Sequence, residues 1–161
     1  MKHHIAIGLG GNIGDSEKIF AEAVECLKQG GLSSVRMASI IVTPAIDCVP
    51  GTPDFRNSAV VGDWEGTPLE LLELTQSIEQ SMGRPLCHSS RESRPLDLDI
   101  LLMDGLCVSE PTLTIPHPRM CGRRFALEPL AQLEPDWIVP GVNLSVLECL
   151  KRLENKERME N

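Results

Sequence analysis

The stretch Leu96-Asp97-Leu98-Asp99-Ile100-Leu101-Leu102-Met103 is the strongest β-strand pattern in the chain. A strand directs alternate side chains to opposite faces, so the leucines and isoleucine would share one face. Asp97 and Asp99 would share the other face, with their backbones about 6.5–7 Å apart. Because aspartate is disfavoured inside strands, two of them within an apolar run indicate a functional role.

Paired carboxylates on one strand face suit a divalent cation, which relieves the repulsion between them. Mg²⁺ typically takes one or two carboxylates together with substrate phosphates. Six arginines, which match phosphate oxygens well, lie between Arg84 and Arg124. The combination predicts a metal and phosphate site; a solvated acidic strand face beside a solvated basic surface is the alternative.

Working outward from this strand, hydrophobic periodicity and capping residues predict an alternation of strands and helices. The elements expected are a strand over Lys2–Leu9, a helix capped by Asp15 or Ser16 and ended by Gly30-Gly31, a strand over Val35–Thr43, a short strand over Asn57–Asp63, a helix opened by the Thr67–Glu70 capping box, the Leu96–Met103 strand, a helix near Arg123–Leu133 interrupted by Pro129, and a last helix from Ser145 to about Leu153 with a frayed end over Glu154–Asn161. This order predicts an α+β fold with a ferredoxin-like βαββαβ core in one domain spanning residues 1–161.

Composition excludes several classes of protein. The chain has 161 residues, of which 42% are hydrophobic and 24% charged, and these values are ordinary for a globular domain. No run of about 18 apolar residues is present, and the N-terminal segment reaches glycines too soon for a signal peptide, so a cytoplasmic protein without a membrane segment is expected. The net charge of −8 argues against non-specific nucleic-acid binding.

The glycines at 8, 10, 11 and 14 follow the first expected strand and are interpreted as a tight turn into the first helix. They do not match the dinucleotide-binding fingerprint, because its third glycine would fall on Ile13, and no Gly-Lys pair marks a Walker A loop. The six cysteines contain no C-x-x-C pair and are expected to be free thiols, mostly buried. No zinc-site spacing joins them to the four histidines.

Several segments together resemble 6-hydroxymethyl-7,8-dihydropterin pyrophosphokinase. The similarity extends from about Ile5 to Ile138. The matching segments are Ile7-Gly8-Leu9-Gly10-Gly11-Asn12, Thr43-Pro44, Phe55-Arg56-Asn57-Ser58-Ala59-Val60, Ile78-Glu79, Gly83-Arg84, Ser93-Arg94-Pro95-Leu96-Asp97-Leu98-Asp99-Ile100-Leu101, Ile115-Pro116-His117-Pro118-Arg119-Met120 and Arg123-Arg124-Phe125-Ala126-Leu127.

The resemblance implies transfer of pyrophosphate from ATP to the hydroxymethyl group of the pterin, with release of AMP, in folate biosynthesis. It also implies a three-layer α/β/α sandwich with a mainly antiparallel sheet. Asp97 and Asp99 would bind two Mg²⁺ ions and, with Arg84 and Arg94, would form the catalytic set. The chain length fits a stand-alone member of the family. A monomer is also expected.

Matching positions imply two neighbouring substrate sites. The residues implied for ATP are Gln76, Glu79, Arg84, Arg94, Ile100, His117 and Arg123. The residues implied for the pterin are Thr43, Pro44, Ile46, Phe55, Asn57, Asp97 and Phe125, with the two phenylalanines on either side of the ring. The polar segment Arg84–Pro95 is expected to close over ATP, although Leu86 and Arg91-Glu92-Ser93 depart from the family's usual residues.

Two other functions stay open from the sequence. The chain could be a different D-x-D enzyme that transfers diphosphate groups, such as a nucleotide-sugar transferase, or a non-catalytic ferredoxin-like module that binds a small ligand. Formation of AMP that depends on both pterin and Mg²⁺ would separate all three.

Overall fold

The computed structural model describes residues 2–44, 50–82 and 95–160. The elements in chain order are β1 (His3–Gly11), α1 (Ser16–Gln29), β2 (Ser33–Met37), β3 (Ile41–Thr43), β4 (Phe55–Trp64), α2 (Pro68–Ser81), β5 (Asp97–Met103), β6 (Val108–Glu110), β7 (Leu113–Ile115), the short 3₁₀ helix η1 (Met120–Gly122), α3 (Arg124–Leu133), β8 (Ile138–Val139), β9 (Leu144–Ser145) and α4 (Val146–Glu160).

The main sheet has the strand order β2-β4-β1-β5, and β3 also pairs with β4. Each pairing in this sheet is antiparallel. With β3 set aside, the elements from β1 to β5 follow the order strand, helix, strand, strand, helix, strand. The α+β prediction with a ferredoxin-like core is therefore confirmed.

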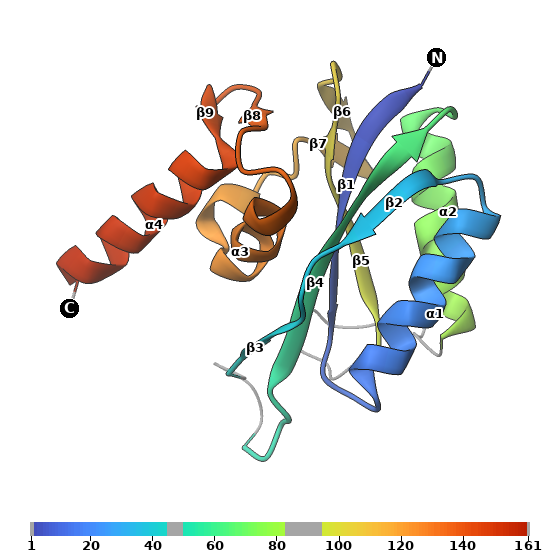
Figure 1. Cartoon of the computed structure of the whole chain (residues 1–161), viewed down its shortest axis with the longest axis horizontal. Helices are drawn as coiled ribbons and strands as arrows, with labels where there is room; N and C mark the ends of the chain where they lie inside the picture. Colours follow the sequence, from blue (N-terminus) through green and yellow to red (C-terminus); the bar gives the residue numbers. More distant parts are fainter. Residues whose placement is uncertain (1, 45–49, 83–94, 161) are drawn as a thin grey trace.

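Helices cover both faces of the sheet (Figure 1). Helices α1 and α2 lie on one side, where Ile7 and Phe20 are fully buried in one apolar core. Helices α3 and α4 lie on the other side, where Leu127 and Leu130 are fully buried in a second core. Each such side chain contributes about 1.5–3 kcal/mol through removal from water. The result is the expected three-layer arrangement, with α4 extending away from the sheet.

The helix starts follow their capping residues as predicted. The Asp15 side chain accepts a hydrogen bond from the Lys18 backbone N–H, and Thr67 and Glu70 form a reciprocal capping box. Ser145 and Glu148 exchange the same pair of hydrogen bonds at the start of α4. Such caps satisfy backbone N–H groups that have no partner within the helix.

Two predictions about the later helices are wrong. Helix α3 runs through Pro129 without interruption, and its buried neighbours Leu127 and Leu130 supply packing that offsets the missing backbone hydrogen bond. Helix α4 continues to Glu160 where fraying was expected. That segment contains strong helix formers and no glycine or proline, and Glu157 lies 3.9 Å from the Arg124 guanidinium of α3.

Other differences concern strands and glycines. The predicted strand over Val35–Thr43 is divided into β2 and β3, and β4 is longer than predicted at both ends. Gly8, Gly10 and Gly11 lie within β1, so the prediction that they form the turn is wrong for those three. Only Gly14 of that group has a positive φ, of 80°, which is the conformation a turn glycine supplies.

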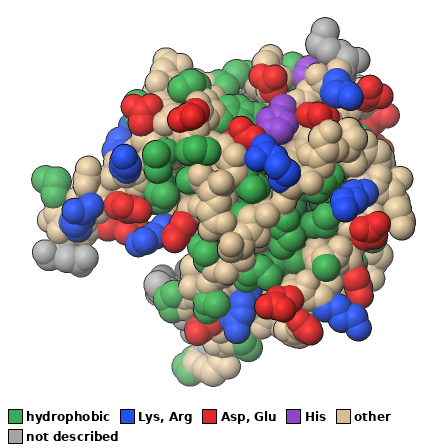
Figure 2. Space-filling model, viewed as in Figure 1, with side chains coloured by type: hydrophobic (Ala, Val, Ile, Leu, Met, Phe, Trp, Pro, Cys, Tyr) green, Lys and Arg blue, Asp and Glu red, His purple; other side chains and the backbone are tan. Residues whose placement is uncertain are grey.

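The four cysteines in the described part of the chain are free, as predicted. The expectation that they are mostly buried is wrong, because only Cys149 is buried while Cys107 is exposed. The described helices include none that is long and apolar enough to cross a bilayer. Figure 2 shows acidic and basic side chains intermixed on the face that it displays.

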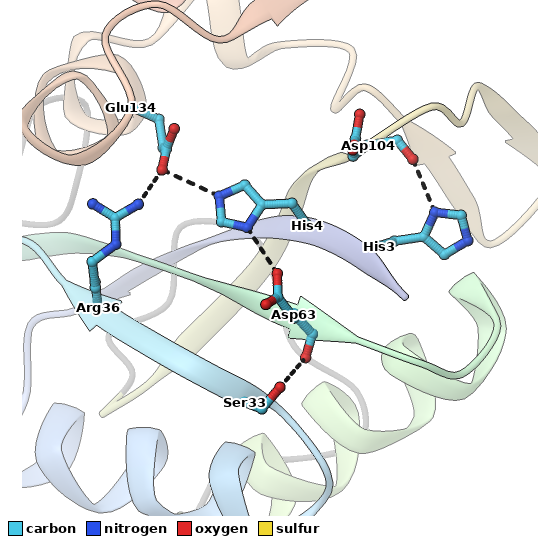
Figure 3. A network of polar contacts seen from close by, with 7 residues as sticks. All are labelled: His3, His4, Ser33, Arg36, Asp63, Asp104 and Glu134. Atoms are coloured by element: carbon cyan, nitrogen blue, oxygen red, sulfur yellow. Dashed lines mark hydrogen bonds and ion pairs between the residues drawn. The ribbon is translucent and has the colours of Figure 1, made fainter. Parts of the chain in front are cut away.

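A polar network joins the sheet to the segment that follows α3 (Figure 3). His4 of β1 lies between two carboxylates, with Nδ1 3.2 Å from Asp63 and Nε2 3.2 Å from Glu134. Arg36 of β2 forms an ion pair with the same Glu134 oxygen, and the Trp137 ring stacks on His4 at 4.9 Å. These contacts fix the end of α3 against β1, β2 and β4.

Candidate functional site

A pocket opens on the face of the sheet that carries α3. Its lining comes from β1, β4, β5, the segment between β7 and α3, and the first turn of α3. The lining residues are Gly8, Leu9, Gly10, Asn57, Ser58, Asp97, Asp99, Leu101, His117, Met120, Arg123, Phe125 and Ala126. The pocket therefore brings together side chains that the sequence analysis proposed for metal, for phosphate and for the pterin ring.

Asp97 and Asp99 both line this pocket from β5. Both are partly buried, whereas Leu98 and Ile100 point into the opposite core with exposures of 5% and 4%. The alternation predicted from the sequence is confirmed from Leu96 to Ile100. It is wrong for Leu102, which lies with Leu101 in the second core because the pairing register with β1 shifts between Ala6 and Ile7. The structure thus presents two neighbouring carboxylates from one strand face to the same cavity.

Glycines in β1 form the floor between the carboxylates and β4. Gly10 pairs with Asp97 on one side and with Asn57 on the other, and Gly8 pairs with Asp99. A Cβ at Gly10 would lie 2.9 Å from the Asn57 Oδ1, which is too close for a real side chain. The absence of side chains here keeps the space beside both aspartates open, a role that the sequence analysis did not identify.

Glu79 supports the aspartate strand from helix α2. Its side chain is buried at 9% exposure, and its Oε2 accepts a hydrogen bond of 2.7 Å from the Leu98 backbone N–H. Because β5 is an edge strand, this carboxylate satisfies a backbone donor at the sheet edge. Gln76 lies three residues earlier in the same helix and is exposed.

His117 is held in the pocket wall by its own backbone and by its ring. The backbone N–H donates to the Leu101 carbonyl at 2.9 Å, and Nδ1 accepts from the Arg119 backbone N–H at 3.1 Å. The ring proton of the neutral form is therefore assigned to Nε2. Burial lowers the pKa of His117, the charges of Arg123 and Arg119 lower it further, and Asp97 opposes them.

Phe125 and Arg123 form the wall contributed by the start of α3. The Arg123 guanidinium carbon lies 5.5 Å from the centre of the Phe125 ring, within reach of a cation–π interaction. Phe125 is 37% exposed, although phenylalanine usually prefers burial. An exposed aromatic face at a pocket is available for stacking on a flat ligand.

The other predicted pterin residues lie on the β3–β4 pair. Thr43 pairs with Phe55 in register, and the Asn57 amide donates to the Thr43 hydroxyl at 3.1 Å. Asn57 is buried and lines the pocket, whereas Phe55 is half-buried and outside the lining. The exposed Pro44 ends the described segment. The structure thus brings Thr43 to Asn57 but does not bring Phe55 to the cavity wall.

The remaining predicted site residues lie either outside the described residues or away from the pocket. Arg84, Arg94 and Ile46 lie outside the described residues, as does the Arg84–Pro95 segment except for its last residue. Ile100 directs its side chain into the core on the opposite face from the pocket. Across residues 2–44, 50–82 and 95–160, no group of three or more His, Cys, Asp or Glu side chains is arranged for a metal ion.

A protein-family model matches most of the chain. Residues 6–135 match the model described as 7,8-dihydro-6-hydroxymethylpterin-pyrophosphokinase (HPPK). The chain belongs to this family. The matched segment includes β1 to β5, both aspartates of the pocket and Phe125.

Curated relatives carry the same name. A 2-amino-4-hydroxy-6-hydroxymethyldihydropteridine pyrophosphokinase of Methylorubrum extorquens is 35% identical over 96% of this chain and 97% of its own length. The Bacillus subtilis protein of that name is 40% identical over 79% of this chain and 75% of its own length. The predicted ATP-dependent pyrophosphokinase is confirmed by these names, and neither alternative function is favoured.

Longer relatives contain additional sequence. A mitochondrial folate synthesis bifunctional protein of Arabidopsis thaliana is 39% identical over 82% of this chain, but the match spans only 24% of that protein. A Plasmodium falciparum HPPK-DHPS crystal structure with pteroate matches 99% of this chain and 46% of its own, with a TM-score of 0.75 and 13% identity. At that identity the second likeness supports the fold alone.

Proposed function

We propose that the pocket between β5 and α3 transfers pyrophosphate from ATP to the hydroxymethyl oxygen of 6-hydroxymethyl-7,8-dihydropterin, with release of AMP. The observation that carries this proposal is the meeting of Asp97 and Asp99 with His117, Arg123 and Phe125 at one cavity. The acidic pair suits cations, the basic side chains suit phosphate, and the ring suits a flat heterocycle. This combination is what a phosphoryl-type transfer to a pterin requires.

Asp97 and Asp99 fit Mg²⁺ through their donor type and their setting. Carboxylate oxygens are preferred Mg²⁺ ligands, and the glycine floor leaves room beside them for water and phosphate oxygens. The described residues contribute two carboxylates to the cavity lining, and substrate and solvent oxygens would supply further ligands. When bound, two Mg²⁺ ions would supply positive charge that offsets the charge of the triphosphate.

Basic and polar side chains on one side of the pocket suit ATP. The neutral His117 can donate its Nε2–H to a phosphate oxygen, and Arg123 offers a planar fork of donors. The set that the resemblance implies for ATP is completed by Gln76 and Glu79 of α2, by Arg84 and Arg94, and by Ile100. These groups would align the triphosphate for attack, which supplies much of the catalysis in such reactions.

The β3–β4 side suits the pterin. Asn57, already hydrogen-bonded to Thr43, offers an amide that can pair with the donor and acceptor edge of the ring. Pro44 and Ile46 adjoin Thr43 in sequence, and Phe125 offers a stacking surface. The cavity volume is about 30 Å³, room for a water molecule, so binding of a bicyclic ring requires the pocket to widen.

The decisive experiment measures AMP by chromatography with ATP, pterin and Mg²⁺ all present. We expect AMP to form only in the complete mixture, and Asp97→Asn to lower its rate of formation by about 10²–10³. Formation of ADP, or AMP formation without the pterin, would contradict the proposal. A single domain over residues 1–161, a monomer and a cytoplasmic location stay predictions that size-exclusion chromatography with light scattering, limited proteolysis and cell fractionation would test.

A further inference from the structure

Two thiols lie next to each other behind the pocket wall. The Cys121 Sγ of η1 and the Cys149 Sγ of α4 are 3.8 Å apart, although 28 positions separate them in sequence. Cys149 is fully buried, and Cys121 is partly exposed. Neither residue lines the cavity described above, and the proposed reaction uses neither of them.

Cys121 lies inside a tightly hydrogen-bonded segment of that wall. The Gly122 backbone N–H donates to the Arg119 carbonyl at 3.1 Å, and the Arg123 N–H donates to the Met120 carbonyl at 3.1 Å. Met120 and Arg123 both line the pocket. A displacement of Cys121 would therefore move two pocket residues to which it is linked by one or two peptide units.

We propose that Cys121 and Cys149 are a redox-sensitive thiol pair, which an oxidant such as a peroxide converts to a disulfide that links η1 to α4 and changes the pocket wall. The sulfurs are close enough to react, but a disulfide bond of about 2.05 Å requires them to approach by roughly a further 1.8 Å. The η1 segment contacts both α3 and α4, so movement of Cys121 towards Cys149 would be transmitted to the start of α3 in the pocket wall.

The chemistry balances with hydrogen peroxide as the oxidant. The Cys121 sulfur attacks one peroxide oxygen, the O–O bond breaks, and a sulfenic acid and one water form. The Cys149 sulfur then attacks the sulfenic sulfur, the S–O bond breaks, and the hydroxyl leaves as a second water with the thiol proton. Two thiols and one peroxide thus give one disulfide and two waters.

The order of the two steps follows from burial. Cys121 is accessible to a small oxidant, whereas Cys149 is not. Burial raises the pKa of the Cys149 thiol to about 11, and the neighbouring Cys121 adds to this shift. Since the thiolate is the reactive form, Cys149 is suited to react second, when its neighbour has already become an electrophile.

The first experiment tests the bond itself. A variant in which Cys26, Cys48, Cys87 and Cys107 are replaced by serine retains only the pair, and it is treated with hydrogen peroxide and then alkylated after denaturation. We expect both thiols to be lost together with a mass decrease of roughly 2 Da, and dithiothreitol to restore them. The expected cross-linked peptide contains Cys121 and Cys149.

Matched controls make the result specific. Cys121→Ser, with all other cysteines present, should lose this cross-link, and Cys107→Ser should keep it. If the four-substitution variant does not fold, peptide mapping of the oxidised wild-type protein gives the same answer. Further oxidation of Cys121 while Cys149 stays fully alkylatable, or cross-links only between different chains, would overturn the proposal.

The effect on the pocket rests on the proposed function and is measured separately. AMP formation by the oxidised wild-type protein should fall and recover with dithiothreitol, whereas Cys121→Ser should show no such reversible fall. An intramolecular disulfide with unchanged AMP formation would overturn the coupling to the pocket. A reduced protein that forms no AMP at all would contradict the proposed function instead, and peptide mapping would still decide the thiol pair.

Discussion

The Glu79 carboxylate accepts a hydrogen bond of 2.7 Å from the backbone N–H of Leu98, the residue between Asp97 and Asp99. Both Glu79 and Leu98 are buried. Helix α2 is thereby attached to the strand that presents the acidic pair, on the side of β5 that no other strand of the main sheet covers. The position of the two aspartates thus depends on a residue from a separate element.

Replacement of Glu79 by alanine should destabilise the protein by about 1–3 kcal/mol, because the buried Leu98 N–H loses its acceptor. Glu79→Gln retains an oxygen acceptor and should cost less. Urea unfolding measures both free energies. Glu73→Ala, an exposed position on the same helix, is the control; equal stability of the Glu79→Ala and Glu73→Ala variants would contradict a supporting role.

Asp97→Asn and Asp99→Asn should each lower the rate of AMP formation by about 10²–10³, as expected when a preorganised charge at the reacting group is lost. Asp104→Asn is a matched control, because Asp104 directly follows β5 and is exposed. Wild-type rates in a folded Asp97 or Asp99 variant would exclude the acidic pair from the reaction.

Gly10→Ala should weaken pterin binding, because its Cβ would lie 2.9 Å from the Asn57 Oδ1 and push that side chain out of place. The displaced amide would lose its 3.1 Å hydrogen bond to Thr43, which is typically worth about 0.5–1.5 kcal/mol. Calorimetry with a pterin measures the change. Gly122→Ala adds a Cβ with nothing within 4 Å and should bind normally; similar losses in both variants would contradict the explanation.

Local patterns account for the parts of the fold that the sequence predicted. The alternation over residues 96–100 and the capping residues Thr67 and Ser145 are local patterns, so they can be interpreted without knowledge of the fold. The open space beside Gly10 has no such local pattern, because it depends on the pairing of Gly10 with Asn57 of β4 and Asp97 of β5. Pro129 is tolerated for a similar reason, since tertiary packing offsets a local preference.

The candidate site also contains some residues with a local sequence signal and others whose role depends on tertiary packing. Asp97 and Asp99 could be identified from the sequence because aspartate is unusual within an apolar strand, whereas the role of Phe125 came only from the resemblance. In contrast, the burial of Glu79 and its hydrogen bond to Leu98 arise only when α2 packs against β5. The sequence alone left Glu79 on a polar helix face, where its role came only from the resemblance.

Phe125→Ala should weaken pterin binding more than ATP binding, because stacking contributes about 0.5–1.5 kcal/mol beyond the buried area. The substitution also removes the ring below Arg123, which frees that guanidinium for phosphate. Calorimetry with a pterin and, separately, with an ATP analogue compares the two sites. Phe55→Ala, made in parallel, tests the second stacking residue. Equal weakening of both ligands by Phe125→Ala would indicate a packing role instead.

Protonation of His117 should lower the free energy of unfolding of the unliganded protein as the pH falls below about 6.5. Burial and the charges of Arg123 and Arg119 lower its pKa in the folded state. Between the lowered value and the ordinary value, the unfolded chain binds the proton more readily than the folded chain does. The stability is therefore fully present above the ordinary pKa and is lost as the pH falls through the folded pKa. Urea unfolding between about pH 7.5 and about pH 5 should show a steeper decline in stability for the wild type than for His117→Gln. Parallel curves for the two proteins would mean that His117 titrates alike in the folded and unfolded states.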